Sequence, residues 1–298
     1  MSLFDQQYLT LAENILNHGD RVENHSQSAP NLKNFPNHAA QNSGTITYRL
    51  PHQILQFDLT KEFPILTTKQ VAFKSAVLEI LWIYQVASND VRWLQNRGIK
   101  IWNEWQIDEN GFYYGKNFGK EFAHTIGTAY GWIINHYDLT RGLIDTIKND
   151  PNNRRMIISL WQNEWLPTAA LPSCVWNTQW SVLGDKLNVI VTVRSNDVPL
   201  GMPFNVTQYA TLCHLIAHVC GLKAGQMTYV INDAHIYENQ IDGIKQQLTR
   251  KNDALPAPTL KINPDITDFF KFDNSKDLLD IKLENYQHLG KISMPVTE

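Results

Sequence analysis

The stretch NTQWSVLGDKLNVIVTVRS, from Asn177 to Ser195, decides the type of sheet that this chain can build. Apolar and polar side chains alternate on both sides of Gly184-Asp185, which is the pattern of two strands that each bury one face. A glycine followed by aspartate between two such runs is typical of a tight hairpin turn. The stretch therefore predicts an antiparallel hairpin and a sheet that contains antiparallel pairs.

The segments around this hairpin mix helical and strand patterns. Apolar residues at helical spacing predict helices over residues 3–16, around Glu79, over 91–98 and over 206–220. Strand patterns appear in TITYRL, HQILQFDL, residues 156–161 and QMTYVIND. Because no repeat or linker divides the chain, we expect one α+β domain over residues 1–298, with a mixed, largely antiparallel twisted sheet flanked by helices.

Two polar stretches interrupt this pattern. The stretch from Asn24 to Ser43 contains two prolines and shows no sustained apolar period. We therefore expect a surface insertion at about residues 24–43. The stretch NDVPLGMPFN, which precedes the helix over 206–220, is interpreted as a loop.

The composition excludes several classes of protein. Lys and Arg number 26 against 29 Asp and Glu, a formal net charge of -3, which argues against nucleic acid as a partner. The most apolar stretch, residues 76–87, is too short to cross a bilayer and contains a glutamate. The three cysteines form no zinc-type pairs, and the N-terminus has no signal-peptide pattern. We therefore expect a reduced, cytoplasmic protein without a metal or a membrane anchor.

The cysteines differ in their local context. Cys213 and Cys220 lie seven residues apart on one predicted helix, hence on one face, where cysteine usually acts as a small buried hydrophobe. Cys174 follows Pro172 in a break between elements, where a side chain can be presented to a pocket. Local sequence leaves open whether Cys174 is a buried sulfur or a nucleophile. A nucleophilic thiol needs nearby positive charge, which directs attention to the arginines.

Two sets of arginines stand at element ends. Arg154 and Arg155 precede a predicted strand, and Arg194 is followed by Ser195 where the hairpin opens into a loop. Guanidinium groups beside a hydroxyl suit a phosphate, which accepts bidentate hydrogen bonds. The alternative is that both sets are solvated surface arginines.

The stretch RSNDVPLGMPFN, from Arg194 to Asn205, resembles the signature of the thymidylate synthases, Arg-Ser-x-Asp followed by Leu-Gly-x-Pro-Phe-Asn. The resemblance continues, in family order, through FPILTTK, EILW, IWNEW, AYG, NNRR, LPSC and DAHIY. The form CVWNTQW resembles the branch that lacks a histidine after the catalytic cysteine. The resemblance implies reductive methylation of dUMP to dTMP, with 5,10-methylenetetrahydrofolate as cosubstrate and dihydrofolate as product. It also implies a homodimer in which Arg154 and Arg155 reach the partner's site.

The resemblance also implies roles for individual residues. Cys174 would add to carbon six of uracil, supported by Tyr130, and Asn205 would read the pyrimidine. Glu79 would relay protons, which agrees with its apolar helix neighbours, because burial raises the pKa of a carboxyl group. The implied dUMP-binding residues are Arg154, Arg155, Arg194, Ser195, Asp197, Asn205, His235 and Tyr237. The implied folate-binding residues are Lys69, Ile101, Trp102, Leu171, Asp197 and Gly201.

Several positions depart from the family pattern, among them Val193 and Asn232, which stand where glutamine and glycine are common in the family. His25 stands where the family has an arginine in a loop that closes over the phosphate, and Arg21 is the proposed substitute. Gln240 replaces the histidine that follows YEN in the resemblance. The end, ISMPVTE, differs from the small apolar tail that closes over folate in the family.

Other functions remain open at this point. A deoxypyrimidylate hydroxymethylase uses the same cysteine and folate, but the deoxycytidylate enzymes carry aspartate where this chain has Asn205. A Cys174/His235 hydrolase would need an oriented base and an oxyanion site, and would not need phosphate arginines. A catalytically idle binding protein could keep the same fold.

Overall fold

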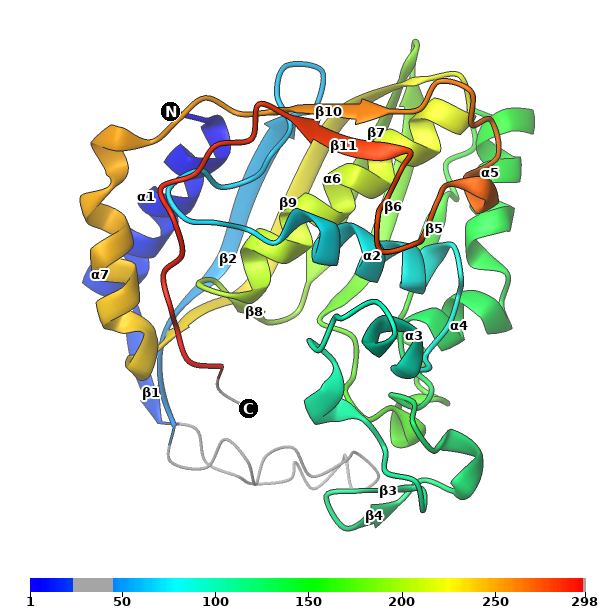
Figure 1. Cartoon of the computed structure of the whole chain (residues 1–298), viewed down its shortest axis with the longest axis horizontal. Helices are drawn as coiled ribbons and strands as arrows, with labels where there is room; N and C mark the ends of the chain where they lie inside the picture. Colours follow the sequence, from blue (N-terminus) through cyan, green and yellow to red (C-terminus); the bar gives the residue numbers. More distant parts are fainter. Residues whose placement is uncertain (24–44, 297–298) are drawn as a thin grey trace.

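A seven-stranded mixed sheet forms the centre of the computed structural model, which describes residues 1–23 and 45–296 (Figure 1). The strand order is β1-β2-β9-β7-β6-β5, and β8 pairs with β9 at one end. The strands are β1 Asp20–Glu23, β2 Ile46–Asp58, β5 Ile157–Ser159, β6 Val175–Leu183, β7 Lys186–Val193, β8 Asn196–Asp197 and β9 Lys223–Tyr237. Strands β7 and β8 run parallel to β9, whereas the other neighbours are antiparallel. The predicted α+β class with a largely antiparallel mixed sheet is confirmed.

The predicted hairpin is the pair β6 and β7. Its register joins Val175 to Val193 at the open end and Leu183 to Lys186 at the turn. Gly184 in the turn has a φ of +62°, a conformation that glycine adopts without a steric penalty. The alternation in the sequence therefore identified the antiparallel pairing correctly.

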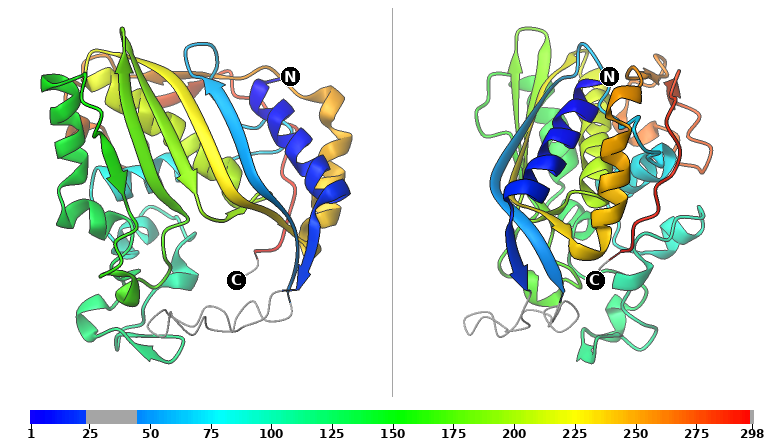
Figure 2. Two further views of the ribbon diagram at one scale, coloured as in Figure 1. Left: turned by 180° about the vertical axis from the view of Figure 1, so that it is seen from behind. Right: turned by 90° about the vertical axis from the view of Figure 1, so that its left-hand side faces the viewer.

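Helices cover one face of this sheet (Figure 2). The helices of the described residues are α1 Leu3–His18, α2 Phe73–Tyr84, α3 Arg92–Gln95, α4 Gly131–His136, α5 Leu139–Asn149, α6 Gly201–Val219 and α7 Ile241–Thr249. The smaller two-stranded sheets are β3 Phe112–Tyr113 with β4 Lys116–Asn117, and β10 Thr259–Ile262 with β11 Ile281–Glu284. In the part of the chain that is described, no helix is long and apolar enough to cross a membrane.

Some element boundaries differ from the sequence prediction. Helix α6 begins at Gly201, inside the stretch predicted as a loop, and Pro203 fits there because a first-turn N–H has no helical partner. The helix predicted over 91–98 is only the short α3, and Ala87, with a φ of +50°, separates it from α2. TITYRL and HQILQFDL lie in the single strand β2. The insertion predicted at about residues 24–43 lies wholly outside the described residues.

The two faces of the sheet have different surroundings. Leu187, Val189 and Val191 of β7 are buried against the helices. On the opposite face Ile54, Ile157 and Ile190 are 62%, 50% and 41% exposed, and no described helix covers them (Figure 2, left). An apolar sheet face that stays open in a single chain is unusual.

Candidate active site

The hairpin brings a thiol and a guanidinium together. Cys174 directly precedes β6 and Arg194 directly follows β7, and the Arg194 N–H donates to the Cys174 carbonyl at 2.9 Å. The Arg194 guanidinium Nη2 lies 3.7 Å from Cys174 Sγ and also donates to the Pro172 carbonyl at 2.8 Å. Its Nε donates to the Ser173 carbonyl at 3.1 Å. Arg194 therefore holds the loop that carries the thiol and offers a hydrogen bond to the sulfur.

Tyr130 holds the same cysteine from the other side. Its hydroxyl oxygen accepts a hydrogen bond from the Cys174 N–H at 2.9 Å. Burial raises the pKa of Tyr130 well above its usual value, so the hydroxyl stays protonated. The φ of Tyr130 is +48°, a rare backbone conformation for a bulky residue. Such strained residues cluster at functional sites, where the surrounding structure maintains them.

Glu79 on α2 is the buried carboxyl group of this region. Its side chain is 9% exposed, and its two oxygens accept from Trp102 Nε1 at 2.7 Å and Gln208 Nε2 at 2.6 Å. Burial raises the pKa of Glu79 to about 7, although both hydrogen bonds act in the opposite direction. A carboxyl group with this pKa can donate or accept a proton near neutral pH. The expectation that burial raises the pKa of Glu79 is confirmed.

Glu79 is the end of a chain of hydrogen bonds. Tyr229 donates to Asn196 Oδ1 at 2.9 Å, and Asn196 Nδ2 donates to Asn205 Oδ1 at 3.3 Å. Asn205 Nδ2 donates to Gln208 Oε1 at 3.1 Å, and Gln208 then donates to Glu79. Every donor points toward the carboxylate, so the orientation of the Asn205 amide is set by its neighbours. Sequence reasoning missed Gln208, although its i, i+3 spacing from Asn205 on a helix was a usable signal.

Asp197 and Lys69 lie close to this network. Asp197 Oδ1 accepts the Leu200 N–H at 2.9 Å, and Oδ2 accepts from Gln240 Nε2 at 3.0 Å. Burial raises the pKa of Asp197. Lys69 is buried and donates to the Pro199 carbonyl, and burial lowers its pKa to about 8. In this structure the lysine amine therefore lies inside the protein, near Asp197.

Gly201, at the start of α6, lies where β8 meets the helix. A Cβ at Gly201 would approach Asn196 Nδ2 to 3.3 Å and Asn205 Oδ1 to 3.8 Å. A side chain at this position would crowd the amide that orients Asn205. The absence of a side chain therefore protects the hydrogen-bond chain.

His235 and Tyr237 share one end of β9. Their rings are 5.2 Å apart in an edge-to-face arrangement, and His235 Nδ1 is 3.0 Å from Asp233 Oδ1. Asp233 also forms an ion pair with Arg49 at 3.1 Å. The β8–β9 register places Asp197 beside His235. Asp233 therefore orients the imidazole, but among the described residues no hydrogen bond joins His235 to Cys174, whose printed partners are Tyr130 and Arg194, and this argues against a Cys174/His235 hydrolase.

Two of the remaining predicted folate residues have partly open side chains. Ile101 is 37% exposed and Leu171 is half-buried. Trp102 is buried, and its ring lies 5.3 Å from that of Tyr130. Trp102 therefore joins Glu79 to the residue that holds Cys174.

Other predicted residues are not brought to the thiol. Arg154 and Arg155 are exposed before β5, and among the described residues neither guanidinium has a hydrogen bond or ion pair. Arg21 on β1 forms an exposed ion pair with Glu238 at 3.8 Å. Ser195 is half-buried next to Arg194. His25 lies outside the described residues, within which no group of three or more His, Cys, Asp or Glu side chains could hold a metal.

Comparisons with known proteins agree with this geometry. The family model described as thymidylate synthase matches residues 6–298. A thymidylate synthase of Clostridium beijerinckii is 49% identical over 297 residues, which is 100% of both chains. Thymidylate synthase 1 of Bacillus subtilis is 37% identical over 99% of both chains. The solved structure of thermostable thymidylate synthase A from Bacillus subtilis matches with a TM-score of 0.82 and 36% identity, over 98% of this chain and 99% of that one. This chain belongs to the thymidylate synthase family.

Proposed function

We propose that Cys174 is the nucleophile with which this folate-dependent methyltransferase converts dUMP to dTMP. The observation that carries the proposal is the position of Arg194 Nη2, 3.7 Å from the Cys174 sulfur, on the loop that the same guanidinium holds in place. A guanidinium at this distance stabilises the negative charge that the sulfur carries when it attacks. No comparable cation contacts Cys213, which is fully buried and bonds to the Leu187 carbonyl within the described residues.

The chemistry requires a nucleophile because carbon five of uracil does not accept a one-carbon unit by itself. A bond from the Cys174 sulfur to carbon six produces an enolate that is nucleophilic at carbon five. The folate cosubstrate supplies both the one-carbon unit and a hydride, and leaves as dihydrofolate. The proton on carbon five is released, and the carbon–sulfur bond breaks again when dTMP forms.

Asn205 and Glu79 suit the two remaining tasks at the base. Within the protein, Asn205 donates one hydrogen of Nδ2 and accepts one hydrogen bond at Oδ1. The second Nδ2 hydrogen and the second Oδ1 lone pair can therefore bind a ligand. The free donor and acceptor match the carbonyl and adjacent N–H of uracil. Glu79, with a pKa of about 7, provides a proton donor or acceptor at the base.

The other contacts follow the positions of the described side chains. The phosphate would be bound by Arg194 and Ser195, with Arg21 as a further candidate, and the ribose hydroxyl by His235 and Tyr237. His235 suits this role because Asp233 holds Nδ1 and leaves Nε2 to face a ligand. The residues proposed to surround the folate are Lys69, Ile101, Trp102, Leu171, Asp197 and Gly201.

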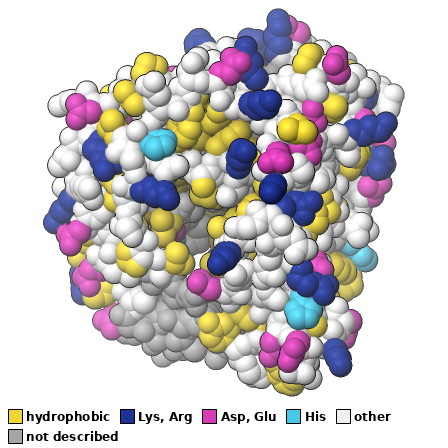
Figure 3. Space-filling view, in the orientation of Figure 1, with side chains coloured by type: hydrophobic (Ala, Val, Ile, Leu, Met, Phe, Trp, Pro, Cys, Tyr) yellow, Lys and Arg dark blue, Asp and Glu magenta, His cyan; other side chains and the backbone are white. Residues whose placement is uncertain are grey.

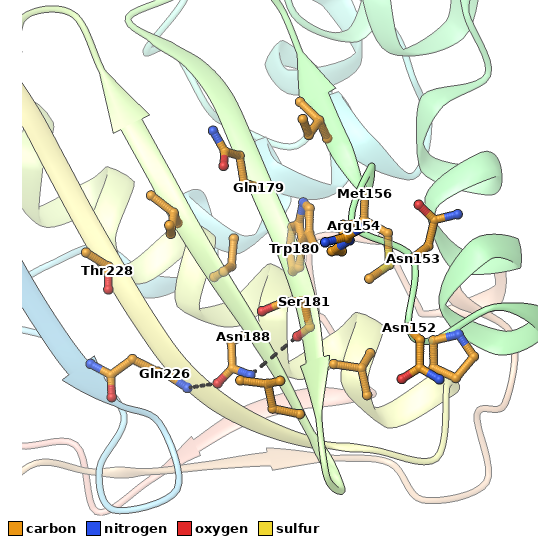
Figure 4. Close-up of a pocket in the computed structure, with 16 residues that line it drawn as sticks. Asn152, Asn153, Arg154, Met156, Gln179, Trp180, Ser181, Asn188, Gln226 and Thr228 are labelled. Carbon is orange, nitrogen blue, oxygen red and sulfur yellow. Dashed lines mark hydrogen bonds between the residues drawn. The ribbon is translucent and has the colours of Figure 1, made fainter.

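We also propose that two copies of the chain pair through the uncovered face of the sheet. A hollow of about 490 Å³ on this face is lined by Arg154, Met156 and Trp180, among others (Figure 4). A second hollow of about 500 Å³ is lined by Trp176 and Arg194. In a two-fold pair the same face meets itself, so Arg154 of one copy can approach Arg194 of the other. This arrangement gives the unbonded Arg154 and Arg155 a substrate phosphate as their partner.

We infer small-molecule substrates from the distribution of surface charge, and a cytoplasmic location from the free cysteines. On the face shown in Figure 3, lysines and arginines are interspersed with acidic side chains and form no continuous basic band. Such a surface provides no electrostatic track for nucleic acid. All three cysteines are free, as is usual in a reducing compartment.

Release of tritium from carbon five of labelled dUMP tests the function directly. The purified protein should release tritium only when 5,10-methylenetetrahydrofolate is present, because carbon five must first react with the one-carbon unit. Formation of a denaturation-stable adduct with 5-fluoro-dUMP and the folate should accompany it. A folded protein that releases no tritium and forms no adduct would be an idle binding protein, contrary to the proposal.

Subunit mixing tests the shared site. Cys174→Ser and Arg155→Ala chains, each inactive as homodimers, are exchanged and assayed together. One site of each mixed dimer then holds both the wild-type thiol and the wild-type arginine, so activity should return. Exchange without recovery would show that Arg155 does not serve the partner's site.

A further inference from the structure

Arg49 lies on β2 directly opposite His235 of β9, its neighbour in the sheet (Figure 1). Side chains at opposed positions of an antiparallel pair project from the same face of the sheet, and so do side chains two residues apart on one strand. Arg49, Asp233 and His235 therefore share one face. Asp233 Oδ2 accepts from Arg49 Nη1 at 3.1 Å, while Asp233 Oδ1 lies 3.0 Å from His235 Nδ1. The arginine thus reaches the imidazole through one carboxylate.

Thr47 sets the direction of the Arg49 guanidinium. Thr47 is buried, and its Oγ1 accepts from Arg49 Nε at 2.7 Å. The side chains of Arg49 and Asp233 are 32% and 25% exposed, so their ion pair is partly shielded from water and is screened less than one in open solvent. One bond at Nε and another at Nη1 fix the plane of the guanidinium, because this group is rigid and flat. The position of the Asp233 carboxylate is fixed with it.

A fixed carboxylate matters because His235 has a second carboxylate beside it. The β8–β9 register places Asp197 next to His235, on the side of β9 opposite to Arg49. Both Asp197 oxygens accept other N–H groups, whereas Asp233 Oδ1 faces His235 Nδ1. An imidazole can turn over about its bond to Cβ and exchange the places of its two nitrogens, so a bond at Nδ1 selects one orientation of the ring. In the selected orientation Nε2 points away from Asp233.

We propose that Arg49 is a positioning residue for the sugar of the nucleotide: by holding Asp233, it keeps His235 Nε2 directed at the 3′-hydroxyl of dUMP. The inference rests on the proposed function, in which His235 and Tyr237 bind that hydroxyl. Without Arg49, Asp233 keeps its bond to the imidazole but loses the bond that fixes its own plane. The 3′-hydroxyl then meets a ring of variable orientation and contributes less to affinity. Arg49 therefore acts on one group of the substrate.

A comparison of two ligands isolates this effect. Calorimetry on the full chain measures the Kd values of dUMP and of 2′,3′-dideoxyuridine 5′-monophosphate, which lacks the 3′-hydroxyl. Wild type should bind dUMP about tenfold more tightly, the scale of one hydrogen bond. In Arg49→Met this ratio should fall below about threefold, while the Kd of the dideoxy ligand stays within about twofold of wild type. Arg49→Lys keeps a positive charge beside Asp233 and should bring the ratio back above about fivefold.

Arg141→Met is the matched control. Arg141 belongs to α5 and forms an exposed ion pair with Asp138 at 3.7 Å. Helix α5 lies near β5, at the opposite edge of the sheet from β1 and β2 (Figure 1). The same substitution at this distant ion pair should leave both Kd values and their ratio unchanged.

The outcomes separate this inference from the proposed function. A wild-type ratio in folded Arg49→Met would overturn the inference, whatever the activity of the variant. An equal rise in the Kd of both ligands would also overturn it, because that result indicates a general disturbance of the site. If Arg49→Met does not fold, Thr47→Val removes the oxygen that holds Nε and keeps the arginine, and an unchanged ratio in that variant counts equally against the inference. A wild type that binds both ligands equally would refute the sugar contact of His235 itself, and the inference with it.

Discussion

Two sets of arginines have very different surroundings. Arg194 lies at the open end of the β6–β7 hairpin, whereas Arg154 and Arg155 precede β5 at the uncovered face of the sheet. Arg194 donates to the backbone carbonyls of Pro172, Ser173 and Cys174, and its guanidinium lies 3.7 Å from the Cys174 sulfur. Arg154 and Arg155 are exposed, and neither guanidinium has a hydrogen bond or ion pair among the described residues. The difference teaches that a single chain supplies the contacts of Arg194, whereas the described residues of the same chain supply none to the two other guanidinium groups.

The largest effect is expected from removing the Cys174 thiol at the open end of the β6–β7 hairpin. Cys174→Ser should lower kcat on the order of 10⁴-fold or more, because a hydroxyl has the shape of a thiol but not its nucleophilicity. Binding of dUMP, measured by calorimetry, should be largely retained. Cys213→Ser is the control, since that sulfur is buried and its pKa is raised to about 12 by burial. A 5-fluoro-dUMP adduct that persists in Cys174→Ser would refute the assignment.

The Asn205 side chain should determine whether the enzyme prefers dUMP or dCMP, and this preference should not depend on the uncovered face of the sheet. Asn205→Asp should lose methylation of dUMP and gain reaction with dCMP, because a carboxylate accepts from the cytosine amino group but faces the uracil carbonyl with like charge. Each mismatched buried polar group costs about 1–3 kcal/mol, so the ratio of kcat/KM values should shift by roughly 10²-fold or more. The comparison uses both nucleotides at one folate concentration. Unchanged preference in a folded variant would mean that Asn205 only caps and packs within α6.

The two sets of arginines should respond differently to dilution. Arg194→Ala should raise the Kd for dUMP about 10- to 100-fold at every protein concentration, the scale of a hydrogen bond of 1.5–3 kcal/mol to a charged group. Arg155→Ala should raise it only where sedimentation shows dimers, because its phosphate belongs to the partner copy. Equal effects of Arg155→Ala on monomer and dimer would place that arginine in its own chain's site.

The last prediction concerns the pH dependence of stability, to which the buried Glu79 contributes. Its pKa is raised from 4.5 to about 7 by burial, so the unfolded carboxyl group ionises first as the pH rises. Stability is therefore unaffected below about pH 4.5, falls between 4.5 and 7, and stays lower above that range. At 1.36 kcal/mol per unit, the wild type should lose up to about 3 kcal/mol relative to Glu79→Gln across this window. Urea unfolding at pH 5 and pH 8 measures the change, with Glu109→Gln, an exposed control, following wild type.

Much of the fold could be predicted because its signals are local. The alternation around Gly184-Asp185 identified the hairpin, and the apolar spacing near the N-terminus identified α1, which runs from Leu3 to His18. The start of α6 was missed because its first turn contains glycine and proline, which indicate a loop when read without the structure. The sequence did not specify the register of the hairpin, and it is the observed pairing of Val175 with Val193 that makes Cys174 and Arg194 neighbours.

The sequence by itself determined the hairpin and the fold class, and its family signature favours Cys174 over the two other cysteines as the nucleophile. Only the tertiary structure decided which side chains orient that site. Gln208 reaches Glu79 across 129 residues of sequence, and Gln240 reaches Asp197 across 43. Periodicity reports which face of one element is buried, but a hydrogen bond between elements depends on their relative placement, which the packing of the whole core sets.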